Sequence, residues 1–448
     1  MTNNVETFAS LKSYQREAVG LLSIGTFLEY FDLMIYVHMA VLLNELFFPK
    51  TDPHTAALLQ AFAFCSTFIF RPLGALIFGY IGDRAGRKST VVITTAMMAI
   101  SCIIMANLPT YSQIGIAASW LITICRIFQG ISSVGEMVGA KLYLTEITKP
   151  PVQYPVVSFI SISSLLGTVA ALGISTAILS IGLEWRIAFW IGASIAMIGV
   201  VARTALRETP EFADAKRRIK KKYEEAALDQ CTLKDNKIFN EKVNKKTILA
   251  YFLVYCIQPV CFYFIYMYCG NILKNSFNYS AERIITHNLI IAIVSLFLAI
   301  YITYLSYKTY PIKTAKIITA IFFIFMLFFP WILSNIKTSF HLLLIQSFIA
   351  LFGNCAIPVT PIFYKHFPIF KRFTYSSFIY ALSHSFMYII TSFGLIYLTD
   401  YLGTYGLLVI MLPMTVGYFI GLNHFENLEK QAGNYPHKNS FDFLVNET

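Results

Sequence analysis

The sequence predicts an all-α membrane protein with twelve transmembrane helices arranged in two six-helix bundles. Hydrophobic residues make up 56% of its 448 residues, and charged residues only 13%. A soluble chain carries about 25% charged residues, so this chain has too few to cover itself with a polar surface. Apolar stretches of about 20 residues, the length that crosses a bilayer as a helix, recur throughout. The alternating ten-residue pattern of membrane β-barrels is missing, which leaves helices.

Twelve apolar segments carry this prediction, six on each side of a long polar segment. The first six are expected over residues 19–43, 57–80, 90–108, 114–144, 156–181 and 186–206. The second six are expected over residues 247–273, 284–306, 315–334, 341–363, 376–398 and 405–423. The expected divisions are an N-terminal segment 1–18, a first bundle 19–206, a linker 207–246, a second bundle 247–423 and a tail 424–448.

The distribution of positive charge predicts the orientation. With a cytoplasmic N-terminus, 27 of the 35 lysines and arginines fall in cytoplasmic segments and only 5 in outside segments. Loops that stay inside are enriched in Lys and Arg, so both termini are expected in the cytoplasm. Topology thereby explains the net charge of +11. The expected partners are the lipid bilayer, a small solute and protons, and nucleic acid is not expected.

Cofactor chemistry and a removable leader are not expected. Seven of the eight cysteines lie in apolar stretches, and no pair has the spacing of a metal site. We interpret them as packing residues and expect neither a metal nor a cofactor. The first 20 residues are polar and contain no apolar core before a cleavage site, so no signal peptide is expected. The chain also lacks the HExxH and GxSxG motifs of common enzymes.

A charged, glycine-rich turn separates the second and third spans. It reads Gly79-Tyr-Ile-Gly-Asp83-Arg84-Ala-Gly86-Arg87-Lys88. Glycine permits the tight reversal, and the charges can latch this end of the bundle to neighbouring helix ends. A nucleotide site is not expected, because residues 82–89 are one residue short of a Walker A motif and follow no strand. Transport would therefore depend on an ion or solute gradient.

This turn resembles the G-x-x-x-D-R-x-G-R-K signature of the major facilitator superfamily. Further motifs resemble its metabolite:proton symporter family, which includes proline/betaine and α-ketoglutarate carriers. They read Gly25-Thr-Phe-Leu-Glu29-Tyr30-Phe31-Asp32, Phe70-Arg71-Pro72-Leu73-Gly74, Arg126-Ile-Phe-Gln129-Gly130 and Arg207-Glu208-Thr209-Pro210-Glu211-Phe212. The resemblance is dense over residues 15–215 and sparse afterwards, and Ala381 stands where the family usually has Asn.

The resemblance implies a major facilitator fold in a bacterial inner membrane and a monomeric transport unit. It also implies proton-coupled import of a small polar solute, such as proline, betaine or a carboxylate like α-ketoglutarate, by alternating access. One alternative is a proton-coupled exporter, but the fifth span lacks the glycine-proline signature of drug antiporters. Another is a membrane sensor that has lost transport, which the divergent second half would permit.

Five charged residues lie deep within spans, away from the span ends, all in the first half: Glu29, Asp32, Arg71, Arg126 and Glu136. Such residues are costly in a bilayer and usually face the bundle interior. At 1.5 Å per residue, Asp32 and Arg126 both lie near the midplane. In the related sugar-porter branch an acid and an arginine at these places pair for proton coupling. We hypothesise that Asp32 carries the proton under the control of Arg126, with Glu29 as rival carrier and a static bridge as the alternative.

The remaining candidates concern substrate and gates. Arg71 is expected either to bind a substrate carboxylate or to neutralise Glu29. Substrate candidates in the second half are Tyr263, Tyr380, His384, Gln258 and Asn354, although packing is the alternative for the aromatic residues. The gating candidates are Gly79, Asp83, Arg84, Gly86, Arg87, Glu136, Glu146 and Glu208. The resemblance implies that Glu146 and Glu208 pair with Arg84 or Arg87.

Overall fold

The computed structural model describes residues 11–85, 87–133, 136–205, 243–368 and 372–435. Within these ranges every regular element is a helix, so the all-α prediction is confirmed. The helices of the first half are α1 Ser13–Phe47, α2 Pro53–Ile69, α3 Arg71–Ala85, α4 Arg87–Asn107, α5 Tyr111–Ile114, α6 Ile116–Ser132, α7 Glu136–Ile147, α8 Gln153–Ser180 and α9 Arg186–Ala205.

The second half is likewise helical. Its α-helices are α12 Lys245–Tyr263, α13 Cys269–Asn275, α14 Ala281–Lys308, α15 Pro311–Ser334, α16 Ser339–Gly353, α17 Thr360–Lys365, α18 Arg372–Leu402 and α19 Gly406–Gln431. Three short elements join them: the π-helix η2 Phe264–Tyr268 and the 3-10 helices η3 Ile357–Val359 and η4 Gly403–Tyr405. Because α19 continues to Gln431, the beginning of the expected tail is helical.

Nine helical stretches of the described chain are long and apolar enough to cross a membrane. One of them, Arg372–Gln431, runs through α18, η4 and α19 and covers two predicted spans. Two shorter apolar helices, Ala96–Asn107 and Arg186–Met197, coincide with two further predicted spans. Every predicted span therefore has a helical counterpart in the structure.

Pro72 interrupts the second span, so that the charged residue Arg71 stands at the start of a new helix. Pro72 has no N–H to donate, and its ring would clash with the carbonyl of residue 68 in a continuous helix. Accordingly α2 ends at Ile69, Phe70 caps it, and α3 begins at Arg71. Pro259 in α12 similarly precedes the π-helix at 264–268, and Pro358 lies in the 3-10 turn between α16 and α17.

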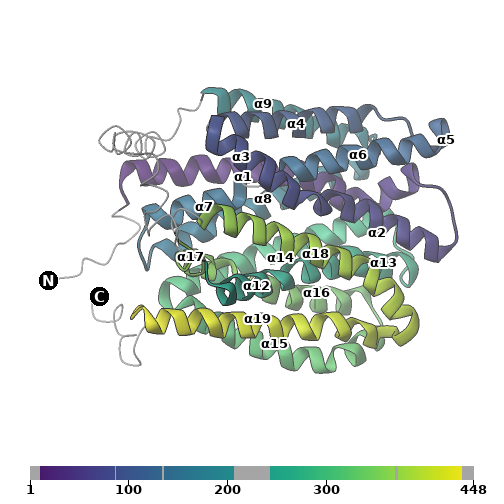
Figure 1. Ribbon diagram of the computed structural model, residues 1–448. Coiled ribbons are helices and arrows are strands. Elements are labelled where there is room, and N and C mark those ends of the chain that lie inside the picture. The colour runs from purple at the N-terminus through teal and green to yellow at the C-terminus, as the bar shows by residue number, and fades with distance from the viewer. Residues whose placement is uncertain (1–10, 86, 134–135, 206–242, 369–371, 436–448) are drawn as a thin grey trace.

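The helices form two groups packed side by side, with the first half above and the second half below in Figure 1. The groups meet through α8 against α14, α18 against α2 and α3, and α17 against α7. The start of α1 and the end of α19 lie at the same end of the molecule, called here the Ser13 end. The opposite end, where α1 finishes, is called the Phe47 end.

Hydrogen bonds fix which way α6 and α7 run. Ser119 Oγ, near the start of α6, donates to the carbonyl of Phe47. At the other extreme, Gln15 Nε2 donates to the carbonyl of Ile147, the last residue of α7. The pair α6–α7 therefore runs from the Phe47 end to the Ser13 end, antiparallel to α1.

Within the first bundle, α6 and α2 approach closely at a glycine. A Cβ atom on Gly130 would overlap the carbonyl oxygen of Thr67 in α2. Only a residue without a side chain fits such a contact, as is common between membrane helices. This contact holds α6, which carries Arg126, against α2.

We expect Gly130→Ala to destabilise the protein by roughly 1–3 kcal/mol, the usual cost of overpacking a core. Thermal unfolding of the purified protein in detergent measures this effect. Gly173→Ala in α8 is the matched control, because a Cβ there meets nothing within 4 Å. Equal unfolding temperatures for the two variants would contradict the close contact.

Candidate functional site

A cavity lies between the two bundles, between the Ser13 and Phe47 ends. Helix α1 contributes two of its lining residues, α3 one, and α18 three, and the rest come from the end of α6 and the start of α7. The lining residues are Glu29, Tyr30, Arg71, Ser133, Met137, Val138, Ser377, Tyr380 and Ala381. Both bundles therefore contribute to the walls, so relative motion of the bundles would reshape the cavity.

Opposite charges face this cavity from adjacent helices. Glu29 of α1 and Arg71 of α3 both line it, and both are buried. The Arg71 guanidinium stacks on the Phe68 ring, with its central carbon 4.6 Å from the ring centre. Arg71 Nε makes no hydrogen bond to the part of the chain that the structure describes. A buried guanidinium with free donor capacity is suited to bind a carboxylate.

Two tyrosine hydroxyls from opposite bundles meet at one methionine in the cavity. Tyr30 Oη of α1 lies 3.2 Å from Met137 Sδ, and Tyr380 Oη of α18 lies 3.8 Å from the same sulfur. A thioether is a weak acceptor, so both hydroxyls keep most of their capacity to donate. A ligand oxygen at this place would receive one donor from each bundle.

The position of Tyr380 is supported by aromatic neighbours in the second bundle. His384 stacks on it with ring centres 4.1 Å apart, and Tyr255 lies edge-on at 5.0 Å. His384 Nδ1 is 3.0 Å from the Tyr380 carbonyl oxygen. Because that oxygen can only accept, Nδ1 carries a proton. His384 thus lies behind the cavity wall, packed against Tyr380, and does not line the cavity.

A second polar cluster lies inside the first bundle and includes Asp32 and Arg126. Arg126 is 0% exposed; it donates from Nη1 to Gln129 Oε1 at 2.9 Å and stacks on Tyr36 at 4.0 Å. Gln129 Nε2 in turn lies 3.5 Å from Cys102 Sγ. Arg126 Nε and Nη2 find no hydrogen-bond partner among the described residues.

Asp32 reaches this cluster through α4 and α9. A methyl group on Gly192 of α9 would lie 3.3 Å from Asp32 Oδ1 and 3.9 Å from Cys102 Sγ. The direct pairing of Asp32 with Arg126 stays a prediction; the contacts described for Arg126 are the hydrogen bond to Gln129 and the stacking on Tyr36. Both residues lie in one buried polar cluster with Gln129 and Cys102.

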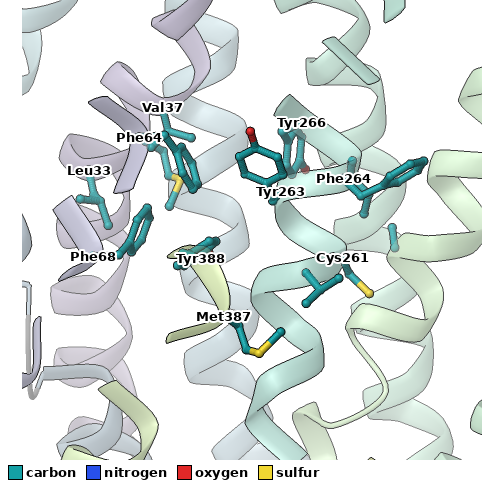
Figure 2. Packing of buried hydrophobic residues seen from close by; sticks show 14 of the residues in the cluster. Leu33, Val37, Phe64, Phe68, Cys261, Tyr263, Phe264, Tyr266, Met387 and Tyr388 are labelled. Atoms are coloured by element: carbon teal, nitrogen blue, oxygen red, sulfur yellow. The ribbon is translucent and has the colours of Figure 1, made fainter. Parts of the chain in front are cut away.

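Contacts between the bundles close the Phe47 side of the cavity. Figure 2 shows Phe64 and Phe68 of α2 against Tyr388 of α18, with ring centres 5.2 and 4.0 Å apart. Ser385 Oγ of α18 donates to the Phe68 carbonyl at 2.6 Å. Tyr263, a predicted substrate residue, lies edge-on to Phe64 at 5.3 Å in this aromatic layer and does not line the cavity.

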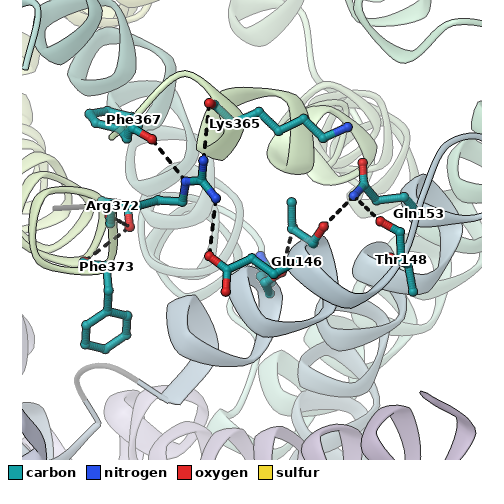
Figure 3. Close-up of polar contacts among 10 residues, drawn as sticks. Glu146, Thr148, Gln153, Lys365, Phe367, Arg372 and Phe373 are labelled. Carbon is teal, nitrogen blue, oxygen red and sulfur yellow. Dashed lines mark hydrogen bonds and ion pairs between the residues drawn. The ribbon is translucent and has the colours of Figure 1, made fainter. Parts of the chain in front are cut away.

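An ion pair joins the bundles at the Ser13 end. Arg372 Nη1 of α18 lies 3.2 Å from Glu146 Oε1 of α7, as Figure 3 shows. Arg372 Nε also donates to the Phe367 carbonyl at 3.1 Å, which ties α18 to the end of α17. The implied pairing of Glu146 with Arg84 or Arg87 stays a prediction, because the structure does not describe the side chains of these two arginines. The partner of Glu146 that the structure does describe, Arg372, comes from the second bundle. Both ends of the cavity thus have contacts between the bundles.

The other gating candidates are described only in part. Helices α3, α4 and α7 include the backbone of Gly79, Asp83, Arg84, Arg87 and Glu136, whose side chains the structure does not describe. Gly86 and Glu208 lie outside the described residues. Their roles as a gate stay predictions.

Two predicted substrate residues lie away from the cavity lining. Asn354 caps α16 and donates from Nδ2 to the Ser295 carbonyl at 3.2 Å, which joins α16 to α14. Gln258 is half-buried on α12. Of the six substrate candidates, only Arg71 and Tyr380 line the cavity. Its residues Tyr30 and Met137 were not predicted, although Tyr30 lies within the motif Gly25-Thr-Phe-Leu-Glu29-Tyr30-Phe31-Asp32.

Comparison with known proteins provides relatives that match part of this chain. A proline/betaine transporter of Salmonella typhimurium is 30% identical over 277 residues, which is 60% of this chain and 55% of that protein. The proline/betaine transporter of Escherichia coli K12 is 35% identical over 44% of this chain and 41% of its own length. An inner membrane metabolite transport protein of the same strain, YhjE, is 38% identical over 44% of this chain and 47% of its own length. The chain therefore matches about half the length of these curated relatives.

Solved structures and a family model extend the comparison over most of the chain. The proton:xylose symporter XylE matches with a TM-score of 0.68 at 15% identity, over 94% of this chain and 96% of that one. The human organic anion transporter MFSD10 matches with a TM-score of 0.64 at 12% identity, over 92% and 100%. At these identities the likeness shows the fold alone. The family model described as Major Facilitator Superfamily matches residues 22–387. The chain belongs to the Major Facilitator Superfamily.

Proposed function

We propose that this protein is a secondary transporter that imports a small carboxylate-bearing solute together with protons. In this proposal it works by alternating access in a bacterial inner membrane, as a monomeric unit with both termini in the cytoplasm. Bundles 19–206 and 247–423, joined by linker 207–246, rock about the cavity between them. The observation that carries the proposal is this cavity, lined from both bundles and containing Glu29 and Arg71.

The chemistry of the lining fits a solute with a carboxylate and a cationic group. Arg71 can receive the carboxylate through two parallel hydrogen bonds, and Tyr30 and Tyr380 can add donors. Glu29 and the faces of the tyrosine rings can receive an ammonium group, including a quaternary one by cation–π contact. The names of the relatives, proline/betaine transporters, support a solute of this kind.

The cluster around Asp32 and Arg126 supports proton coupling. Both side chains are buried within the first bundle, where an isolated charge is costly. In the proposed cycle Asp32 accepts a proton when its cluster opens toward one side of the membrane and releases it when the cluster opens toward the other. The positive charge of Arg126 favours release of the proton, because a nearby cation stabilises an ionised carboxylate. The fold neighbour named as a proton:xylose symporter makes this coupling plausible on the same architecture.

Uptake by proteoliposomes under an imposed pH gradient tests the proposal. The panel consists of proline, glycine betaine, α-ketoglutarate and citrate, with the full chain as the reconstituted protein. We expect at least one solute to accumulate only when the outside is acidic, and to stop accumulating when a protonophore removes the gradient. Accumulation driven by the opposite gradient would indicate an exporter. A lack of uptake of every solute in either direction would contradict transport and favour the sensor.

A further inference from the structure

Lys141 is a buried lysine in α7, one helical turn beyond the cavity residue Met137. Its side chain is only 6% exposed. It is one of the 27 cations counted in cytoplasmic segments, although the predicted span 114–144 includes it. The structure includes it in α7, which continues to Ile147. Glu146, which is exposed, lies five residues farther on, about 7.5 Å along the helix axis.

The Lys141 ammonium forms neither a hydrogen bond nor an ion pair with any residue that the structure describes. Other lysines of the chain have acidic partners: Lys274 pairs with Glu45, and both Lys316 and Lys430 pair with Glu426. A buried cation without a counter-charge is strongly disfavoured. Lysines near helix ends in membranes often extend to the interface, but Lys141 as a residue is only 6% exposed.

Helix geometry directs Lys141 toward the cavity. Side chains on a helix lean toward its N-terminus, and α7 runs from the cavity toward the Ser13 end. Lys141 therefore leans back over the turn that carries Met137, which lies on the same face. Helix α7, which carries Lys141, and helix α3, which carries Arg71, both pack against α18, which carries His384. His384 stacks on the cavity residue Tyr380, so both cations lie near the same wall.

We propose that Lys141 forms a second anion-binding subsite beside the cavity, which receives the second carboxylate of a solute whose first carboxylate binds Arg71. This inference rests on the proposed function and narrows its substrate class to solutes with two carboxylates. The charges agree: with Glu29 ionised, Glu29, Arg71 and Lys141 sum to one positive charge. An acidic amino acid, with two carboxylates and one ammonium, neutralises it. With Glu29 protonated, a dicarboxylate without an ammonium does so.

Binding of matched solute pairs tests this subsite independently of transport. The pairs are glutamate with glutamine and α-ketoglutarate with 2-oxopentanoate, which differ at the second carboxylate. Dissociation constants are measured by calorimetry on the purified full-length protein in detergent. We expect the wild type to bind the two-carboxylate member about tenfold or more tightly, as for a hydrogen bond to a charged group.

Variants assign that preference to Lys141. Lys141→Gln should weaken binding of the two-carboxylate member by about tenfold or more, so that both members of a pair bind about equally. Lys141→Arg should keep the preference for the second carboxylate. Lys149→Gln, a nearby exposed lysine at the Ser13 end, is the matched control and should behave as the wild type. Thermal unfolding establishes that each variant is folded, and Lys141→Met serves if the Gln variant is unstable.

The results separate this subsite from the proposed function. An unchanged preference in folded Lys141→Gln would overturn the subsite, as would a wild type that does not prefer the second carboxylate. If such a wild type still imports betaine or proline with protons, the proposed function stands and the subsite falls. If the preference depends on Lys141 but reconstituted protein shows no uptake, the subsite stands and the import proposal falls.

Discussion

Asp32→Asn should abolish proton-driven accumulation of the solute while exchange between pre-loaded proteoliposomes and the medium continues. Asparagine keeps the size of the side chain but cannot exchange a proton, so the bundles can still rock around a bound solute. Coupling to the gradient is lost, and the accumulation ratio falls to unity. Counterflow and gradient-driven uptake, measured on the same vesicles, distinguish the two activities.

Two further variants sharpen this result. Glu45→Gln, which changes an exposed carboxylate that pairs with Lys274 at the Phe47 end, is the matched control and should keep coupled uptake. Glu29→Gln tests the rival proton carrier. If Asp32→Asn accumulates solute normally and Glu29→Gln does not, the assignment to Asp32 is wrong and the proton is carried in the cavity itself.

Arg71→Gln should weaken binding of carboxylate-bearing solutes by about 10- to 100-fold, the range for a hydrogen bond to a charged group. The reason is that Arg71 is a buried cation in the cavity lining with an unused donor at Nε. Arg71→Lys should fall between, because lysine keeps the charge but not the two-pronged geometry. Dissociation constants and the KM of uptake report the change.

This variant also separates the two sequence-based interpretations of Arg71. If Arg71 only neutralises Glu29, the double variant Glu29→Gln with Arg71→Gln should bind solute as the wild type does. If Arg71 binds the carboxylate, the double variant should remain as weak as Arg71→Gln. Arg186→Gln, at the Phe47 end where Arg186 pairs with Glu184, is the control for loss of a cation.

Helix positions and depths could be predicted because they depend on local sequence. The length of an apolar segment identifies a span, and the helical rise of 1.5 Å per residue puts Asp32 and Arg126 at similar depth in the membrane. Glu29 and Arg71 stood out for the same reason, since a charge in an apolar segment is visible without any structure. The residues that connect the charges were not visible. Cys102, Gln129 and Gly192 come from three helices, and only the packing of those helices brings them into one cluster with Asp32.

Neutral and apparently peripheral residues were the hardest to interpret. Asn354 looked like a ligand, but its amide bonds to a carbonyl of α14 near the end of α16. Lys141 looked like a loop cation, because the burial of a residue near a span end depends on which neighbouring helix covers it. The partner of Glu146 also required the structure, because Arg372 is 226 residues away along the chain.

The unequal distribution of charge between the bundles has an electrical consequence. Within residues 245–368 and 372–435, the carboxylates, lysines and arginines lie near helix ends, whereas the first bundle holds Glu29, Asp32, Arg71, Arg126 and Lys141 within its helices. Moving one elementary charge through the membrane field is worth about 2.3 kcal/mol per 100 mV. In the proposed cycle the second bundle therefore moves as an electrically silent body. The charge translocated per turnover is therefore determined by the first bundle and the solute and protons that it carries.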